Sequence, residues 1–200
     1  MLFNKKTKIA FVLPTRCGST SVKEFLEGVG FCQLRHPALP THHHIKYSEA
    51  VELYPELAGY KKYGIYRDPV ERFTSTVNYL MCGKDVSPDE FLDFFDKRPD
   101  SHLDIFKEPQ TEWLGFGDVE VIKFENLATD VPAAAGGDTN ATNFPHLNCS
   151  SQGKNFSDQY LKIMGIDTKK RNKEIKDFVE QYYLADYEFL NSRATELVVE

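Results

Sequence analysis

The sequence contains no hydrophobic segment long enough to cross a membrane, which would need about 20 consecutive apolar residues. Its first apolar run, Ile9 to Leu13, is also too short for the hydrophobic core of a signal peptide. We therefore expect a soluble, cytoplasmic protein that has no membrane partner. Without a secretory signal, the three Asn-X-Ser/Thr sequons, at Asn140, Asn148 and Asn155, give no prediction of glycosylation.

Cysteine is scarce and positive charge is not in excess. The four cysteines are Cys17, Cys32, Cys82 and Cys149. They are far apart and form no Cys-X-X-Cys pair, which excludes a zinc knuckle and a disulfide framework and predicts thiols in a reducing compartment. The 24 basic residues are outnumbered by 30 acidic ones, so the net charge of -6 argues against a nucleic-acid partner. An anionic ligand would need a locally basic pocket.

The apolar residues that are present indicate a single α/β domain. With 41% hydrophobic residues in a chain of 200, residues 1–200 are enough for one globular domain with a core. Three short apolar segments, Thr7 to Leu13, Tyr63 to Tyr66 and Val119 to Phe124, predict strands, and helical spacing of apolar residues follows the first two. This alternation predicts a three-layer fold with a mainly parallel central sheet. A further helix is expected at about 172–190, and the Ala- and Gly-rich stretch 129–143 predicts a surface loop.

The turn after the first predicted strand, residues 14–21, reads PTRCGSTS. Gly18 permits a close backbone approach, Arg16 supplies a guanidinium group, and the start of the next helix supplies backbone amides. The hydroxyl groups come from Ser19, Thr20 and Ser21. The composition predicts a P-loop-like turn that cradles a phosphate or sulfate, although such residues can equally do no more than cap the helix. The Gly-Lys pair of a Walker A loop is missing, which argues against a nucleoside triphosphatase.

Cys17 in the same turn keeps a second enzyme class open. A cysteine at a helix start can become a nucleophilic thiolate, as in protein phosphatases. The sixth residue after it is Lys23, however, where such an enzyme needs a phosphate-binding arginine. A Cys17-dependent phosphatase is therefore the less favoured alternative.

A second polar turn follows the strand Tyr63 to Tyr66. It begins with Arg67-Asp68-Pro69, and Ser75 comes eight residues after Arg67, about two helical turns into the next helix. Ligands of parallel α/β sheets bind beyond the carboxyl ends of the strands, so both turns are candidates for one site. We expect Arg67 and Ser75 to bind one phosphate, although Arg-Asp-Pro at a strand end can also be a purely structural turn.

The two turns together resemble those of the sulfotransferases that depend on 3′-phosphoadenosine 5′-phosphosulfate (PAPS). The resembling motifs are P-x-x-x-G-S-T-S from Pro14 and R-D-P-x-x-R-x-x-S from Arg67. The resemblance extends to Pro109-Gln110, to residues 122–127 and 146–148, and to Tyr183 and residues 186–189. It covers most of the chain and is closest to the carbohydrate branch that includes the uronyl 2-O-sulfotransferases.

The resemblance implies a sulfuryl transfer from PAPS to an acceptor hydroxyl, without a metal, leaving the product PAP (3′-phosphoadenosine 5′-phosphate). Arg16, with Cys17 in the same turn, and Gly18 to Ser21 would hold the 5′-phosphosulfate, and Arg67 with Ser75 the 3′-phosphate. The family usually has lysine after the proline of the first motif. Here Thr15 follows Pro14, and Arg16 keeps the positive charge. The acceptor implied by the resemblance is a carbohydrate, or else another small molecule with a hydroxyl group.

The acceptor hydroxyl must lose its proton, which calls for a general base whose pKa is near 7. His42, His43 and His44 lie between the two turns in sequence, and related sulfotransferases carry their catalytic histidine in a comparable segment. Strand alternation would place His42 and His44 on one side and His43 on the other. We predict His44 as the base, with His42 second. A module that binds PAPS, PAP or a sulfated ligand without turnover is the alternative from a different class.

Overall fold

The computed structural model describes residues 1–37, 43–81, 105–115, 119–136, 144–145, 176–177, 179–181 and 183–189. The chain divides into two compact units. The first comprises Met1–Arg67 and Gln110–Asn148, and the second comprises Asp68–Pro109 and Cys149–Glu200. The single domain expected over residues 1–200 stays a prediction. No helix within the described ranges is long and apolar enough to cross a membrane.

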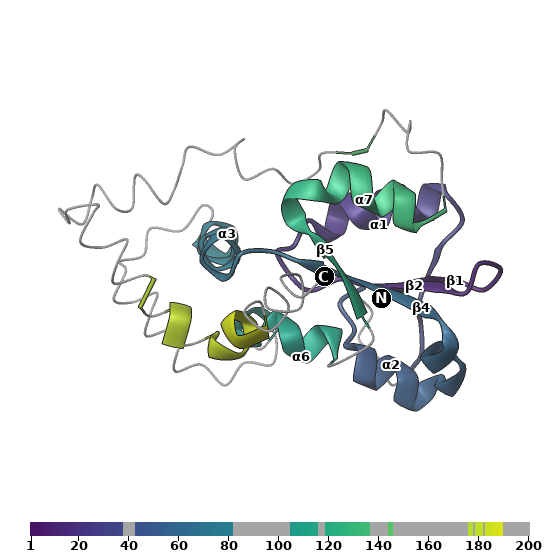
Figure 1. The fold of residues 1–200 in the computed structure, drawn as a ribbon, viewed down its shortest axis with the longest axis horizontal. Coiled ribbons are helices and arrows are strands. Elements are labelled where there is room, and N and C mark those ends of the chain that lie inside the picture. Colours follow the sequence, from purple (N-terminus) through teal and green to yellow (C-terminus); the bar gives the residue numbers. More distant parts are fainter. Residues whose placement is uncertain are drawn as a thin grey trace, which may run out of the picture. The chain divides into compact units, whose positions relative to one another are not determined.

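The first unit contains a five-stranded mixed sheet in the order β3-β1-β2-β4-β5 (Figure 1). The strands are β1 (Leu2–Asn4), β2 (Ile9–Val12), β3 (Cys32–Gln33), β4 (Lys61–Tyr66) and β5 (Val119–Lys123). The core strands β2, β4 and β5 pair in parallel, whereas β1 pairs antiparallel with both β2 and β3. The α/β class, the three predicted strands and the parallel core of the sheet are thus confirmed.

The antiparallel edge was not predicted from the sequence. It is formed because residues 5–8 make a tight turn between β1 and β2, in which the Asn4 side-chain oxygen accepts hydrogen bonds from the backbone N–H groups of Lys6 (2.9 Å) and Thr7 (3.2 Å). An asparagine that bonds the backbone two residues ahead mimics a turn. The first residues of the chain, Leu2–Asn4, are therefore one arm of a hairpin whose turn holds the lysines.

Two apolar clusters lie against the sheet, one on each face, because successive side chains of β2 point to opposite faces. Phe11 packs with Leu26 of α1 (Ser19–Gly28) and Val131 of α7 (Leu127–Ala134). Ala10, the preceding residue, packs instead with Ala50 of α2 (Tyr47–Leu53) and with η1 (Pro55–Gly59). Neighbouring strand residues point to opposite faces, so each face has its own core. Figure 1 shows α1 and α7 on one side of the sheet and α2 with α6 (Gln110–Leu114) on the other.

Helix α7 corrects the prediction of a surface loop at 129–143, since it continues to Ala134. The short helix η2 (Phe124–Asn126) leads into it. The proline inside α7, Pro132, is buried together with Leu127 and Val131. Packing of these side chains against the sheet outweighs the preference of proline and small residues for a loop.

The second unit contains α3 (Pro69–Met81), which confirms the helix predicted after the second turn. The Asp68 carboxylate accepts a hydrogen bond from the Glu71 N–H (3.0 Å), so Asp68 caps this helix. The core of the unit includes Arg72, whose guanidinium donates to the Glu108 carbonyl (2.9 Å) and lies 5.4 Å from the centre of the Tyr183 ring. Within the predicted helix at 172–190, the residues 176–177, 179–181 and 184–189 are helical.

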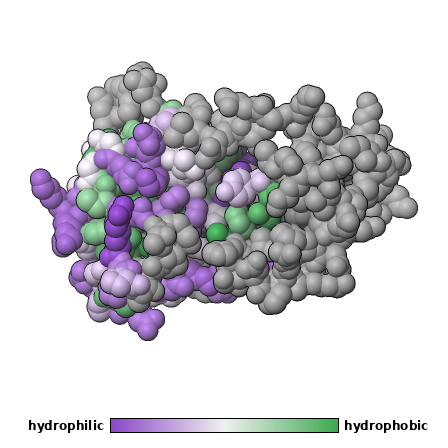
Figure 2. Space-filling view, turned by 180° about the vertical axis from the view of Figure 1, so that it is seen from behind, coloured by the Kyte–Doolittle hydropathy of each residue, from purple (hydrophilic) through white to green (hydrophobic). Residues whose placement is uncertain are grey.

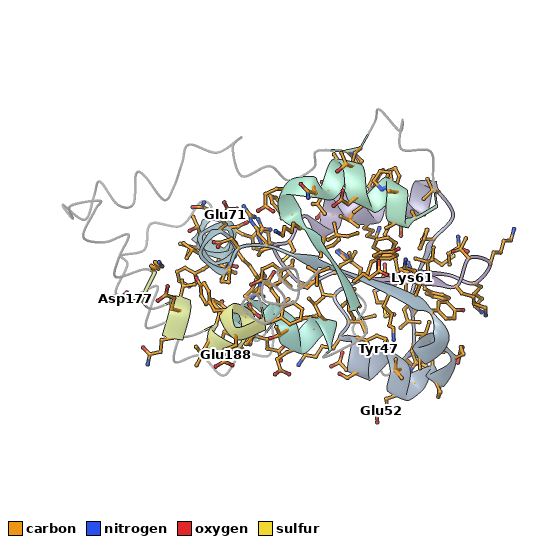
Figure 3. All side chains as sticks on the ribbon, in the orientation of Figure 1. Tyr47, Glu52, Lys61, Glu71, Asp177 and Glu188 are labelled. Atoms are coloured by element: carbon orange, nitrogen blue, oxygen red, sulfur yellow. The ribbon has the colours of Figure 1, made fainter. Side chains whose placement is uncertain are left out.

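Several acidic residues among the described ones lie on the surface. Glu52 of α2 and Glu71 of α3 are exposed, as are Asp177 and Glu188 (Figure 3). On the face drawn in Figure 2 the described surface is mainly hydrophilic. The net negative charge of the chain therefore says little about the buried turns, where charge must be examined residue by residue.

Candidate anion-binding site

In the turn between β2 and α1, two residues have a left-handed backbone conformation. Arg16 has φ of 61° and Gly18 has φ of 71°. Gly18 is the N-cap of α1, which corrects the expectation that one of the hydroxyl residues would cap the helix. A Cβ added to Gly18 would lie 2.6 Å from Leu127 Cδ1 and 3.1 Å from Phe124 Cε2, so only glycine fits. The amide groups at the N-terminus of α1 are thereby presented at the end of β2.

Arg67 at the end of β4 contacts this turn directly. Its Nη1 donates a hydrogen bond to the carbonyl oxygen of Arg16 (3.2 Å), and its guanidinium carbon lies 4.1 Å from the centre of the Phe124 ring. The parallel strands β2 and β4 are neighbours, so their carboxyl ends meet at one edge of the sheet. The structure thus brings Arg67 together with the first turn, although Arg16 and Arg67 are 51 residues apart in the sequence.

Gln110 is the residue that sequence reasoning missed. It is completely buried at the start of α6. Its Oε1 accepts hydrogen bonds from the Arg67 backbone N–H (2.9 Å) and from the Cys17 thiol (3.0 Å), and its Nε2 donates to the Arg67 carbonyl (2.8 Å). The only signal in the sequence was the place of Pro109-Gln110 in the family resemblance, because no periodic pattern marks a polar residue whose partners are distant.

Cys17 is part of the packed interior. Its side chain is fully buried, and its single S–H proton faces two acceptors, the Thr15 carbonyl (3.4 Å) and Gln110 Oε1 (3.0 Å). A sulfur that donates to carbonyl oxygens carries its proton, whereas a nucleophilic cysteine is an accessible thiolate. This geometry disfavours the Cys17-dependent phosphatase. Cys17 and Cys32 are both thiols rather than disulfide partners, and Cys82 and Cys149 lie outside the described residues.

The predicted hydroxyl residues differ in burial. Ser19 and Ser21 are buried, and Thr20 is half-buried, as is Arg16. Ser75 is buried within α3 and belongs to the second unit. The expectation that Ser75 and Arg67 bind one phosphate stays a prediction.

His44 lies next to the end of β2. Its Nδ1 is 2.9 Å from the carbonyl oxygen of Leu13, and its ring meets the Trp113 ring edge-on at 6.3 Å between centres. Because a carbonyl only accepts hydrogen bonds, Nδ1 carries the hydrogen. In a neutral imidazole Nε2 is then the nitrogen that can accept a proton. His44 therefore has the tautomer that a general base needs.

The strand alternation expected for the histidines is not present. Residues 43–46 form no strand, and the rings of His43 and His44 lie 4.2 Å apart. His43 therefore does not point away from His44 as alternation would require. His42 lies outside the described residues.

The described residues contain no group of three or more His, Cys, Asp or Glu side chains that could hold a metal ion. The charged side chains of the two turns, Arg16 and Arg67, are both cationic, and the N-terminus of α1 adds backbone donors, which suits an anion rather than a cation. Comparisons with protein-family models, curated proteins and solved structures find no match. The function must therefore be argued from the residues of this site.

Proposed function

We propose that this protein is a PAPS-dependent sulfotransferase that transfers a sulfuryl group to an acceptor hydroxyl, in the cytoplasm and without a metal. The observation that carries the proposal is the hydrogen bond between the Arg67 guanidinium and the carbonyl of Arg16. It joins two arginine-bearing segments, each at the carboxyl end of a parallel strand, and one of them leads into the N-terminus of α1. This donor set suits a ligand with two separated phosphate or sulfate groups.

The proposed binding mode assigns one anionic group to each turn. Arg16 and the residues Gly18 to Ser21 bind the 5′-phosphosulfate, and Cys17 contributes through its backbone because its thiol is engaged by Gln110. Arg67 and Ser75 bind the 3′-phosphate. We further propose that the turn acts as a P-loop-like cradle and that the helices on the two sides of the sheet make a three-layer domain. Both were expected from the sequence.

In the proposed mechanism His44 Nε2 takes the proton of the acceptor hydroxyl. PAPS supplies the sulfuryl group. As the acceptor oxygen bonds to sulfur, the bond between sulfur and the 5′-phosphate oxygen breaks, and the 5′-phosphate oxygen keeps the electron pair. Arg16 and the amides of α1 stabilise the negative charge that develops on the leaving group. The Leu13 carbonyl holds the His44 ring through Nδ1 (2.9 Å). The remaining contribution is positioning of the two reactants. We propose a carbohydrate as acceptor, from the family resemblance alone.

The test is a calorimetric titration of the protein with PAP and with adenosine 5′-phosphate, both in EDTA. PAP should bind, and Arg67→Ala should weaken PAP about tenfold or more beyond its effect on adenosine 5′-phosphate, because only PAP carries the 3′-phosphate. Arg35→Ala, which removes an exposed arginine elsewhere in the same unit, is the matched control and should change neither affinity. Equal losses for both nucleotides would remove Arg67 from the 3′-phosphate site.

An acceptor screen with labelled PAPS separates the enzyme from the binding module. Sulfate transfer to a hydroxyl compound selects the sulfotransferase. Tight binding of PAP without transfer to any acceptor selects the non-catalytic alternative, which the replacement of the family lysine by Arg16 makes relevant. Failure of the wild-type protein to bind PAP would refute the sulfotransferase and a module for PAPS or PAP, and would leave only a module for another sulfated ligand.

A further inference from the structure

The side-chain amide of Gln110 forms hydrogen bonds with the backbone of Arg67 in the way that a backbone peptide group would. It accepts from the Arg67 N–H and donates to the Arg67 carbonyl, at 2.9 and 2.8 Å. These are the two groups that a neighbouring strand would bond if β4 continued beyond Tyr66. Gln110 thus fixes both backbone polar groups of the residue at which β4 ends.

The same side chain closes a ring of contacts around the first turn. Gln110 Oε1 also accepts from the thiol of Cys17 (3.0 Å), and Arg67 Nη1 donates to the carbonyl of Arg16 (3.2 Å). Because Arg16 and Cys17 are consecutive, four residues form one closed network between the ends of β2 and β4. Its members are buried or half-buried. In such surroundings a hydrogen-bonded network is rigid, and removal of one member breaks the bonds that it makes to the others.

The network also holds a residue whose backbone conformation needs support. Arg16 has φ of 61°, which residues other than glycine rarely adopt and which persists only where neighbouring groups enforce it. Helix α6, which carries Gln110, is itself seated on β4. The space above Gly64 is filled by Leu114, and a Cβ at Gly64 would lie 2.3 Å from Leu114 Cδ2.

We infer that Gln110 is a positioning residue that sets the spacing between Arg67 and the turn from Arg16 to Gly18. It thereby determines selectivity for a nucleotide that carries anionic groups on both its 5′ and 3′ oxygens. This inference rests on the proposed function for its ligand, but the positioning role can be measured without a ligand. In the proposed binding mode Gln110 contacts neither anionic group, because its side-chain amide is bonded to Arg67 and Cys17.

Two variants of Gln110 and one control test the inference. Gln110→Leu keeps the approximate size and removes the hydrogen bonds to Arg67 and Cys17. Gln110→Glu keeps the accepting oxygen and replaces the donating N–H with a second oxygen that faces the Arg67 carbonyl. Leu57→Ala removes a buried side chain from the other apolar cluster of the same unit, so it lowers stability without touching the network.

The first measurement is amide hydrogen exchange in the unliganded protein. Gln110→Leu should speed exchange about tenfold or more in segments 14–21 and 66–68, with a smaller effect for Gln110→Glu. Leu57→Ala should not single out these two segments. Unchanged exchange in Gln110→Leu would overturn the inference, whatever the protein binds.

The second measurement is the ratio of the affinities for PAP and adenosine 5′-phosphate. Gln110→Leu should reduce this ratio about tenfold, whereas Leu57→Ala should leave it unchanged. A normal ratio in Gln110→Leu, with Arg67→Ala defective, would overturn the selectivity role and leave the sulfotransferase proposal intact. If the wild-type protein binds no PAP, the proposed function and the selectivity role both fail, and hydrogen exchange still decides the positioning role.

Discussion

Substitution of Gly18 by alanine should destabilise the first unit strongly, for two separate reasons. A left-handed conformation costs a residue with a Cβ about 1–2 kcal/mol, and Gly18 has φ of 71°. The new methyl group would also lie 2.6 Å from Leu127 Cδ1, well inside van der Waals contact. Overpacking of a core typically costs about 1–3 kcal/mol. We expect Gly18→Ala to lower the free energy of unfolding by about 2–5 kcal/mol, a large share of the 5–15 kcal/mol that is typical of a protein domain.

Gly30→Ala separates the two contributions. Gly30 also has a positive φ, of 90°, but a Cβ there would meet no atom within 4 Å. This variant should lose only the backbone contribution of about 1–2 kcal/mol. The assay is urea unfolding followed by far-UV circular dichroism and by fluorescence, with stabilities compared at a common denaturant concentration.

A double-mutant cycle tests the clash itself. Leu127→Ala alone should cost about 2–5 kcal/mol, because Leu127 is buried in the core. In the Gly18→Ala background it should cost less, since the shorter side chain removes the 2.6 Å contact. Equal destabilisation by Gly18→Ala and Gly30→Ala, or strict additivity with Leu127→Ala, would refute the steric argument.

Three further predictions follow from other residues. His44→Ala should lower the rate of sulfate transfer about a hundredfold while PAP affinity in calorimetry stays within twofold of wild type; full activity in the single variants of His42, His43 and His44 would exclude a base from this segment. Tyr183→Phe should lower the free energy of unfolding by about 1–3 kcal/mol, because it leaves the Phe106 carbonyl without the 2.9 Å hydrogen bond from the buried hydroxyl; urea unfolding checks this, and an unchanged midpoint would contradict it. Burial, followed by the negative charges of Asp68, Glu180 and Asp186, raises the pKa of Tyr187 to about 12. The neutral phenol is thus favoured in the fold, so its contribution to stability is complete below pH 10 and is lost as pH rises towards 12; absorbance titration at 295 nm should show a late component that Tyr187→Phe lacks.

Short-range patterns in the sequence predicted much of the first unit. The apolar runs that became β2 and β4 were recognisable because a buried parallel strand needs apolar residues on both faces. The edge strand β5 was recognisable from a shorter apolar segment, in which Val119 and Ile122 are buried while Glu120 and Lys123 are exposed. The start of α3 was recognisable because proline fits the first turn of a helix and aspartate caps it, as Asp68 does through the Glu71 N–H. The same local reasoning marked Arg16, Gly18 and Arg67 as residues that end strands and begin turns.

Local reasoning was wrong where packing decides. Residues 129–134 have the composition of a loop, yet α7 forms because Leu127 and Val131 pack with residues of the sheet. The hydroxyl residues after Gly18 looked like helix caps, but the tight approach of Leu127 and Phe124 leaves Gly18 as the cap. In each case a contact with a residue distant in sequence outweighs the preference of the segment itself.

The sequence by itself determined which residue types stand at the two turns, and with them the prediction of an anion site. Only the tertiary structure decided that these turns share a network, because the bonds of Gln110 to Arg67 and Cys17 span 43 and 93 residues. It also decided that the Cys17 thiol is buried and that His44 carries its hydrogen on Nδ1, facing the Leu13 carbonyl. The physical reason is that residue pattern and turn chemistry act over a few positions, whereas burial and side-chain hydrogen bonds depend on which segments the packed sheet brings together.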